Sequence, residues 1–137
     1  MPNEQRWVGV RGTNIVILAC AISAGIHGAL APEHFEEGIG AGLGFVIATV
    51  AAAVLAAVLT YRPSQLALAA AGIVFAGLIA SYAFAVTTGV PVLHPEPEAV
   101  DSLALATKAV EALGLAAVSL LHRPQLSFGI QPKGTSA

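Results

Sequence analysis

The sequence has little charge for its length. Of 137 residues only 10% are Asp, Glu, Lys or Arg, whereas 56% are hydrophobic. A soluble domain usually carries about 25% charged residues, so this composition excludes a protein that faces water on all sides. The few basic residues are also too scattered for nucleic-acid binding, which needs a clustered basic patch.

Cysteine and methionine are nearly absent, with one residue of each. The lone Cys20 cannot form a disulfide within the chain, and Met1 alone argues against a thioether pathway for copper(I). The sequence also lacks a glycine-rich phosphate loop, a dinucleotide fingerprint, a nucleophile motif, and the HExxH and CxxC patterns of zinc sites. These absences favour binding or transport over enzymatic catalysis, although an open metal position would be able to activate water.

The chain does have four long apolar runs, at about residues 14–31, 38–60, 65–88 and 99–121. A helix needs about 20 residues to cross about 30 Å of hydrocarbon, and each run meets or nearly meets that length. We therefore expect an all-α integral membrane protein: one four-transmembrane-helix bundle over residues 1–124, with a polar tail at 125–137. Small residues recur in these runs, as in Gly38-x-Gly40-x-Gly42-x-Gly44, and predict close helix packing.

Charges of opposite sign flank opposite ends of these runs. Of the six Lys and Arg residues, all but Lys108 lie on one side, and the acidic connections lie on the other. Basic loops face the cytoplasm, which predicts a multi-pass protein of the bacterial inner membrane with both termini cytoplasmic. An alternative interpretation of residues 1–31 is a signal peptide. Pro32 would then be the first residue after the cleavage site, where signal peptidases tolerate proline poorly.

The two halves of the chain share loop chemistry. An Arg-Pro pair follows the second run at Arg62 and the fourth run at Arg123, 61 residues apart, and the same offset aligns Glu37 with Glu98. This pattern indicates either two parallel helical-hairpin repeats, related by an axis along the membrane normal, or chance agreement between similar loops. If the repeat is real, both acidic connections should converge on one site.

Pro32 and Pro95 each precede acidic residues in these connections. Proline suits the first turn of a helix, where its missing N–H has no cost. We therefore expect these acids near the N-termini of the second and fourth helices, where the helix dipole favours carboxylates. Capping alone would explain several of them.

Three of the four histidines lie on the acidic side of the runs. His27 is close to the end of the first run, and Cys20 and Ser23 share its helical face. Neutral imidazole and carboxylate ligands suit a divalent transition metal such as Zn, Mn, Fe or Ni. The predicted ligands are His27, His34, Glu37, His94 and Glu98, with Glu33 and Asp101 as further polar residues. The alternative is that each histidine is simply a polar residue at the membrane interface.

Lys108 and Glu111 lie near the middle of the fourth run. Their i, i+3 spacing permits an ion pair, and each charge at that depth costs at least about 2.5–3.5 kcal/mol, so both should face the bundle interior. We expect either a charge pair that acts as a gate or relay, with Thr49, Ser81 or Tyr82 continuing a polar path, or a structural pair that fixes helix register.

These features favour a small membrane protein that binds a divalent metal at its extracytoplasmic face, for transport or delivery, in the lipid bilayer. Four helices are few for a transport path, so we expect a homo-oligomer or a partner membrane protein. One alternative is a non-catalytic accessory subunit of a larger respiratory or transport complex. Another is a haem electron carrier with two histidine ligands, such as His27 and His94. The overall sequence resembles small four-helix membrane proteins of high-GC bacteria, a resemblance that implies no activity.

Overall fold

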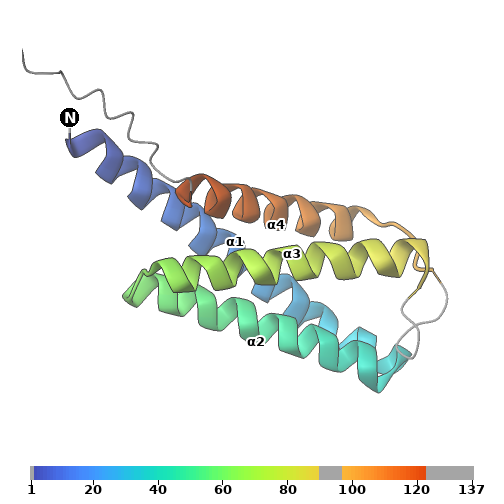
Figure 1. Ribbon diagram of the computed structural model, residues 1–137. Helices are drawn as coiled ribbons and strands as arrows, with labels where there is room; N and C mark the ends of the chain where they lie inside the picture. Colours follow the sequence, from blue (N-terminus) through green and yellow to red (C-terminus); the bar gives the residue numbers. More distant parts are fainter. Residues whose placement is uncertain (1, 90–96, 123–137) are drawn as a thin grey trace, which may run out of the picture.

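The computed structural model describes the backbone of residues 2–89 and 97–122, and the side chains from residue 10 onward within those ranges. It contains four helices, α1 (Pro2–Glu37), α2 (Ile39–Tyr61), α3 (Gln65–Thr87) and α4 (Ser102–Leu121) (Figure 1). The expected all-α four-helix bundle is therefore confirmed. All four helices are long and apolar enough to cross a membrane, so the chain is a multi-pass membrane protein.

The first helix differs most from expectation, because α1 continues through Pro32 to Glu37. The prediction that Pro32 and the acids after it begin the second helix is wrong, since Glu33, Glu36 and Glu37 end the first. An internal proline removes only one backbone hydrogen bond. The helical hydrogen bonds resume after the proline, up to the bond from the Gly38 N–H to the His34 carbonyl, so the helix does not stop there.

A one-residue connection at Gly38 joins α1 to α2. The Gly38 N–H donates to the His34 carbonyl at 3.1 Å, and the Gly38 carbonyl accepts from the Gly42 N–H at 3.1 Å. The Phe35 ring lies directly over Gly42, where a Cβ atom would overlap it. Gly42 is thus required for this turn.

The starts of α3 and α4 follow from side-chain caps. Ser64 accepts a hydrogen bond from the Ala67 N–H at 3.1 Å at the start of α3. Asp101 accepts one from the Ala104 N–H at 2.8 Å, so α4 begins at Ser102 and not at residue 99. Asp101 therefore has the capping position expected of an acid before the fourth helix.

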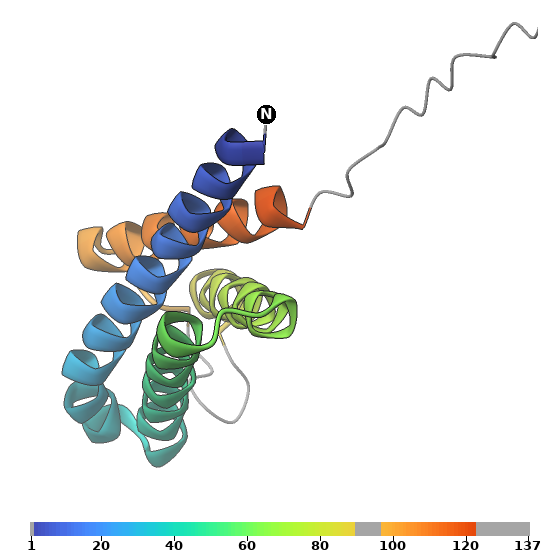
Figure 2. The ribbon, with the colours of Figure 1, turned by 90° about the vertical axis from the view of Figure 1, so that its left-hand side faces the viewer.

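The helices form two hairpins that meet along α1 and α4. Figure 2 shows α1 inclined to the others, with α2 along one flank and α4 crossing its N-terminal part. At this crossing a Cβ on Gly114 would lie 2.9 Å from the Cβ of Ala19 and 2.7 Å from Cζ of Phe75. The helices approach closely because Gly114 has no side chain.

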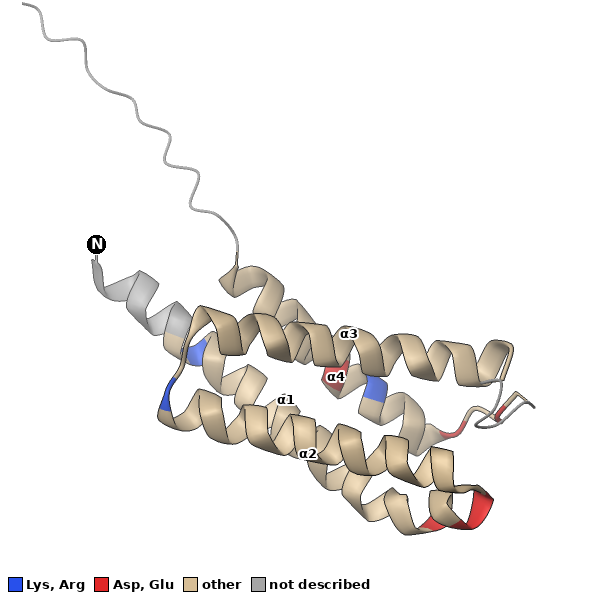
Figure 3. Cartoon of the chain, turned by 60° about the horizontal axis from the view of Figure 1, so that its bottom comes forward, with Lys and Arg blue, Asp and Glu red and all other residues tan. Residues whose placement is uncertain are grey.

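The two ends of the bundle carry opposite charges among the described side chains (Figure 3). We call the end with Arg11 and Arg62 the basic end. The acidic end carries the other group: Glu33, Glu36, Glu37, Glu98 and Asp101. Of the charged side chains that the structure describes, Lys108 and Glu111 alone lie between these ends, in the middle part of α4.

The buried apolar core fills the half of the bundle nearer the basic end. Its largest member is Phe75, fully buried among residues of all four helices: Val16, Ala19, Cys20, Leu59, Ala67, Leu68, Ala71, Ala117 and Val118. The outward faces keep large apolar side chains exposed, as at Ile47, Ile73 and Leu113. Such faces suit lipid contact. The hairpins are thus packed together at one end, and the acidic half has room for a cavity.

Candidate functional site

A partly open cavity of about 710 Å³ occupies the acidic half. All four helices and the segment before α4 line it. Its walls are mostly apolar and small, and its polar residues fall into two groups. Carboxylates lie toward the acidic end, at Glu33, Glu37, Glu98 and Asp101. Deeper in the cavity are His27, Thr107 and Lys108.

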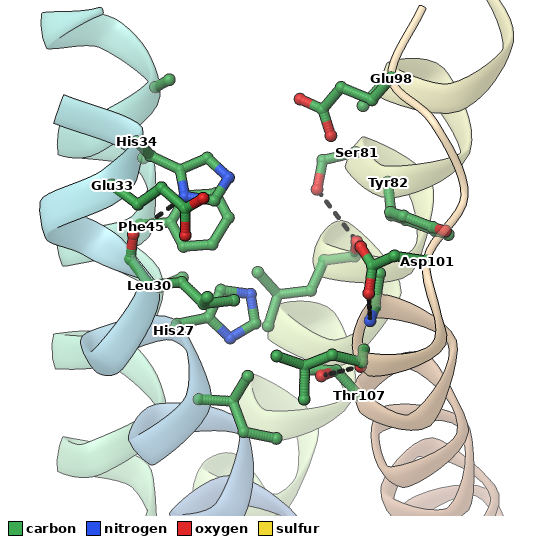
Figure 4. Close-up of a pocket in the computed structure, with 18 of the residues that line it drawn as sticks. His27, Leu30, Glu33, His34, Phe45, Ser81, Tyr82, Glu98, Asp101 and Thr107 are labelled. Atoms are coloured by element: carbon green, nitrogen blue, oxygen red, sulfur yellow. Dashed lines mark hydrogen bonds between the residues drawn. The ribbon is translucent and has the colours of Figure 1, made fainter. Parts of the chain in front are cut away.

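His27 and His34 share one wall of this cavity (Figure 4). They are two turns apart on α1, and both rings contact Phe45 of α2. The His34 ring stacks on Phe45 with centroids 3.6 Å apart, and the His27 ring lies tilted at 5.3 Å. Phe45 therefore orients both imidazoles.

The two histidines also have the same hydrogen-bonding arrangement. Nδ1 of His27 lies 2.9 Å from the Ser23 carbonyl, and Nδ1 of His34 lies 2.9 Å from the Leu30 carbonyl. A carbonyl only accepts, so Nδ1 carries the proton in both rings. Each Nε2 therefore keeps a free lone pair when its ring is neutral. This is the tautomer that a metal-binding histidine needs, held by a backbone acceptor.

Each Nε2 has a carboxylate at nearly the same separation. Nε2 of His34 is 4.0 Å from Oε2 of Glu37, and Nε2 of His27 is 3.9 Å from Oε1 of Glu111. These distances exceed a hydrogen bond, and a water or a cation between the two atoms would bridge them. We call His34–Glu37 the outer pair and His27–Glu111 the inner pair.

Glu111 is completely buried, yet both of its oxygens have partners. The Ser23 hydroxyl donates to Oε1 at 2.8 Å, and Lys108 Nζ donates to Oε2 at 2.6 Å. Ser23 also accepts from His27 through its carbonyl. Ser23 thus fixes both members of the inner pair, and it connects α1 to α4.

Lys108 lines the cavity floor and forms the ion pair expected from its spacing with Glu111. Its Nζ also donates to the Leu78 carbonyl of α3 at 3.3 Å and lies 5.6 Å from the centre of the Tyr82 ring. The charge of Lys108 is therefore compensated within the protein. Whether the pair gates a path stays a prediction.

The opposite wall carries Glu98 and Asp101, with Ser81 and Tyr82 of α3 (Figure 4). Ser81 donates to the Leu78 carbonyl at 3.0 Å. Among the described residues, the Tyr82 hydroxyl is the one buried side-chain polar atom without a hydrogen-bond partner. Thr49, which we had placed on the same polar path, donates to the Phe45 carbonyl instead and does not line the cavity.

The predicted ligands do not gather around one point in the part of the chain that the structure describes. No three His, Cys, Asp or Glu side chains there lie close enough to hold a metal ion. The reason is helical geometry, since seven residues separate His27 from His34 by about 10 Å along the axis. Cys20 lies in the apolar core, away from the cavity lining. His94 lies outside the described residues, as does the tail 125–137.

Sequence reasoning missed three contributors to this site. It did not identify Phe45 as the platform for both imidazoles, nor Thr107 at the floor, nor the contact between Ser23 and Glu111. Only Ser23 had a signal in the sequence, its shared helical face with His27. The contact itself depends on which helices are neighbours.

Comparisons of the chain with protein-family models, with curated proteins and with solved structures found no match.

Proposed function

We propose that this protein binds a divalent transition metal ion at its extracytoplasmic face and moves it along α1, for transport or for delivery to a partner. The outer pair receives the ion and the inner pair takes it deeper. The observation that carries the proposal is the repeated imidazole–carboxylate pair, at 4.0 and 3.9 Å, with both imidazoles on one wall of the cavity.

The geometry of each pair supports binding of an ion between its members. Bonds from zinc to imidazole nitrogen and to carboxylate oxygen are about 2.0–2.2 Å long. A cation between Nε2 of His34 and Oε2 of Glu37 therefore reaches both atoms with little movement. Water completes the coordination, because no third protein ligand is close among the described residues.

A site with only two protein ligands suits a protein that passes metal ions on better than one that stores them. A conduction site must bind strongly enough to admit an ion and weakly enough to release it. The acidic residues around the cavity mouth raise the local concentration of cations before binding. We therefore expect weak sites that exchange quickly.

Lys108 has a specific part in this mechanism. With no ion bound it neutralises Glu111, which otherwise leaves a charge buried at mid-membrane depth. An ion at the inner pair takes over that role, and Lys108 keeps its contact with the Leu78 carbonyl. In this mechanism the metal ion partly replaces the ammonium group of Lys108 as the positive partner of Glu111.

Zinc titration of the purified protein by equilibrium dialysis tests the proposal. We expect two weak sites per chain, one lost in His34→Ala and the other in His27→Ala. His122→Ala is the matched control, because His122 lies at the far end of α4 and also binds a carbonyl through Nδ1. Acidification should release the zinc, since a protonated imidazole cannot bind metal.

Zinc binding that is unchanged in both α1 variants would contradict the proposal. The same sample separates the alternatives. A Soret absorption band would favour a haem carrier, for which His94 is the second predicted ligand. A metal-free protein that copurifies with a membrane complex at fixed stoichiometry would favour an accessory subunit.

A further inference from the structure

The cavity is much larger than a metal ion needs. Its volume of about 710 Å³ is that of a drug-sized ligand site, for which about 300–1,000 Å³ is usual. At about 30 Å³ per molecule it would hold on the order of twenty waters. Water against apolar walls is unfavourable, by about 25 cal/mol for each Å² of apolar surface left wet.

A stripe of small residues on α2 makes this space. Gly40, Gly44 and Ala48 recur every fourth residue and all line the cavity. At Gly44 a Cβ atom would meet no other atom within 4 Å. Small residues usually let another helix approach, but no helix packs on Gly44. The space beside Gly44 is therefore open, whereas the space beside Gly42, two residues earlier, is occupied by the Phe35 ring.

The remaining walls set the chemistry of what fits. Leu30, Leu78 and Leu103 offer aliphatic surface, and Phe45 and Tyr82 offer aromatic rings. Such walls favour a bulky apolar body. No peptide segment of the described chain enters the space.

The charges around the cavity favour a positive ligand. Four carboxylates line its outer part, and the only Lys or Arg among the described lining residues is Lys108. Lys108 is already paired with Glu111 at 2.6 Å. A ligand therefore meets a net negative field at the mouth and no free positive charge below it.

We propose that this cavity binds a drug-sized lipophilic organic cation, with its apolar surface against the α2 stripe and its positive charge near the carboxylates of the acidic end. This ligand is of another class than the metal ion proposed above, and its binding needs neither imidazole as a ligand. The two kinds of cation share this cavity, and Glu37 belongs both to the outer pair and to the acidic mouth.

Equilibrium dialysis with tetraphenylphosphonium tests the proposal on the purified full chain in detergent. We expect one saturable site per chain. Tetraphenylborate has the same shape and the opposite charge, so it should show only unsaturable partition into micelles. No metal is present, and the outcome is therefore separate from that of the zinc titration.

Gly44→Leu supplies the decisive variant, because Gly44 lines the cavity and a Cβ added there meets nothing within 4 Å. We expect phosphonium affinity to fall by about tenfold or more. Gly77→Leu is the matched control: a Cβ at Gly77 also meets nothing within 4 Å, but Gly77 does not line the cavity. Its affinity should stay within about twofold of the unmodified chain.

Three results would overturn the proposal. The first is equal phosphonium binding by both glycine variants, which would place the binding outside this cavity. The second is saturable binding of the borate, which would show that charge plays no part. The third is a change of oligomeric state in Gly44→Leu with no saturable site in the unmodified chain, which would assign the cavity to a second copy.

Discussion

At the scale of single residues, one serine organises the inner pair. Ser23 donates to Glu111 at 2.8 Å, and its carbonyl holds Nδ1 of His27 at 2.9 Å. Ser23 of α1 thereby holds both the carboxylate of Glu111 on α4 and the imidazole of His27. All three side chains are buried, where such hydrogen bonds are stronger than in water.

The Lys108–Glu111 pair gives the first prediction. Lys108→Met leaves the fully buried Glu111 without its cation, which should lower the free energy of unfolding by about 3–5 kcal/mol. Glu111→Gln should have an effect of similar size. The double variant should lose much less than the sum, because no unpaired charge remains. Denaturant titration in micelles measures all three, and additive losses would show that the pair is not coupled.

At the scale of helices, glycine has opposite uses at different positions. The space beside the Cα of Gly42 is occupied by the Phe35 ring, and that beside Gly114 by the Phe75 ring. Gly44 and Gly77 face open space. The sequence alone does not separate these cases, because the same residue type serves close packing and cavity formation.

A matched pair of alanine substitutions tests the packing. Gly114→Ala places a Cβ 2.9 Å from the Cβ of Ala19 and should destabilise the bundle by about 1–3 kcal/mol. Gly77→Ala should leave stability unchanged or raise it by about 0.5–1 kcal/mol, since alanine is the better helix former. Thermal unfolding in detergent compares them, and equal melting temperatures would contradict the crossing of α1 and α4.

The length of a helix was predictable from the sequence where polar or capping residues follow and precede its apolar run. The second and third apolar runs match α2 and α3 within one residue at each end, since apolar length and the Ser64 cap define them. The first run does not match α1, because the helix begins well before residue 14 and continues through Pro32 to Glu37. Of the cavity, the sequence predicted only that side chains capable of binding metal gather at one end of the bundle. Its depth depends on how far the hairpins separate, which is a property of tertiary packing.

At the scale of the whole molecule, the bundle is closed toward the basic end and hollow toward the acidic end. The apolar core around Phe75 seals one half, and the Ser23–Glu111–Lys108 network lies between it and the cavity. A ligand that entered from the acidic end would meet this network before the core. Passage to the basic end therefore requires the hairpins to move relative to one another.

The orientation of this arrangement in the membrane gives a further prediction. Glu36 and Arg62 are exposed at opposite ends of the bundle, and the native Cys20 is completely buried and should not react. In intact cells of a bacterial host, a membrane-impermeant maleimide should label Glu36→Cys and spare Arg62→Cys until the cells are opened. The reverse pattern would turn the cavity toward the cytoplasm and contradict capture from outside.

X-ray absorption spectroscopy of the zinc-loaded protein tests the metal assignment most directly. We predict a first shell of mixed nitrogen and oxygen, with bonds of about 2.0–2.2 Å and the outer-shell scattering of imidazole. That scattering should disappear in the double variant His27→Ala/His34→Ala and persist in His122→Ala. A shell of oxygen alone in the unmodified protein would contradict the account, because the zinc would then be held by the acidic side chains without either imidazole.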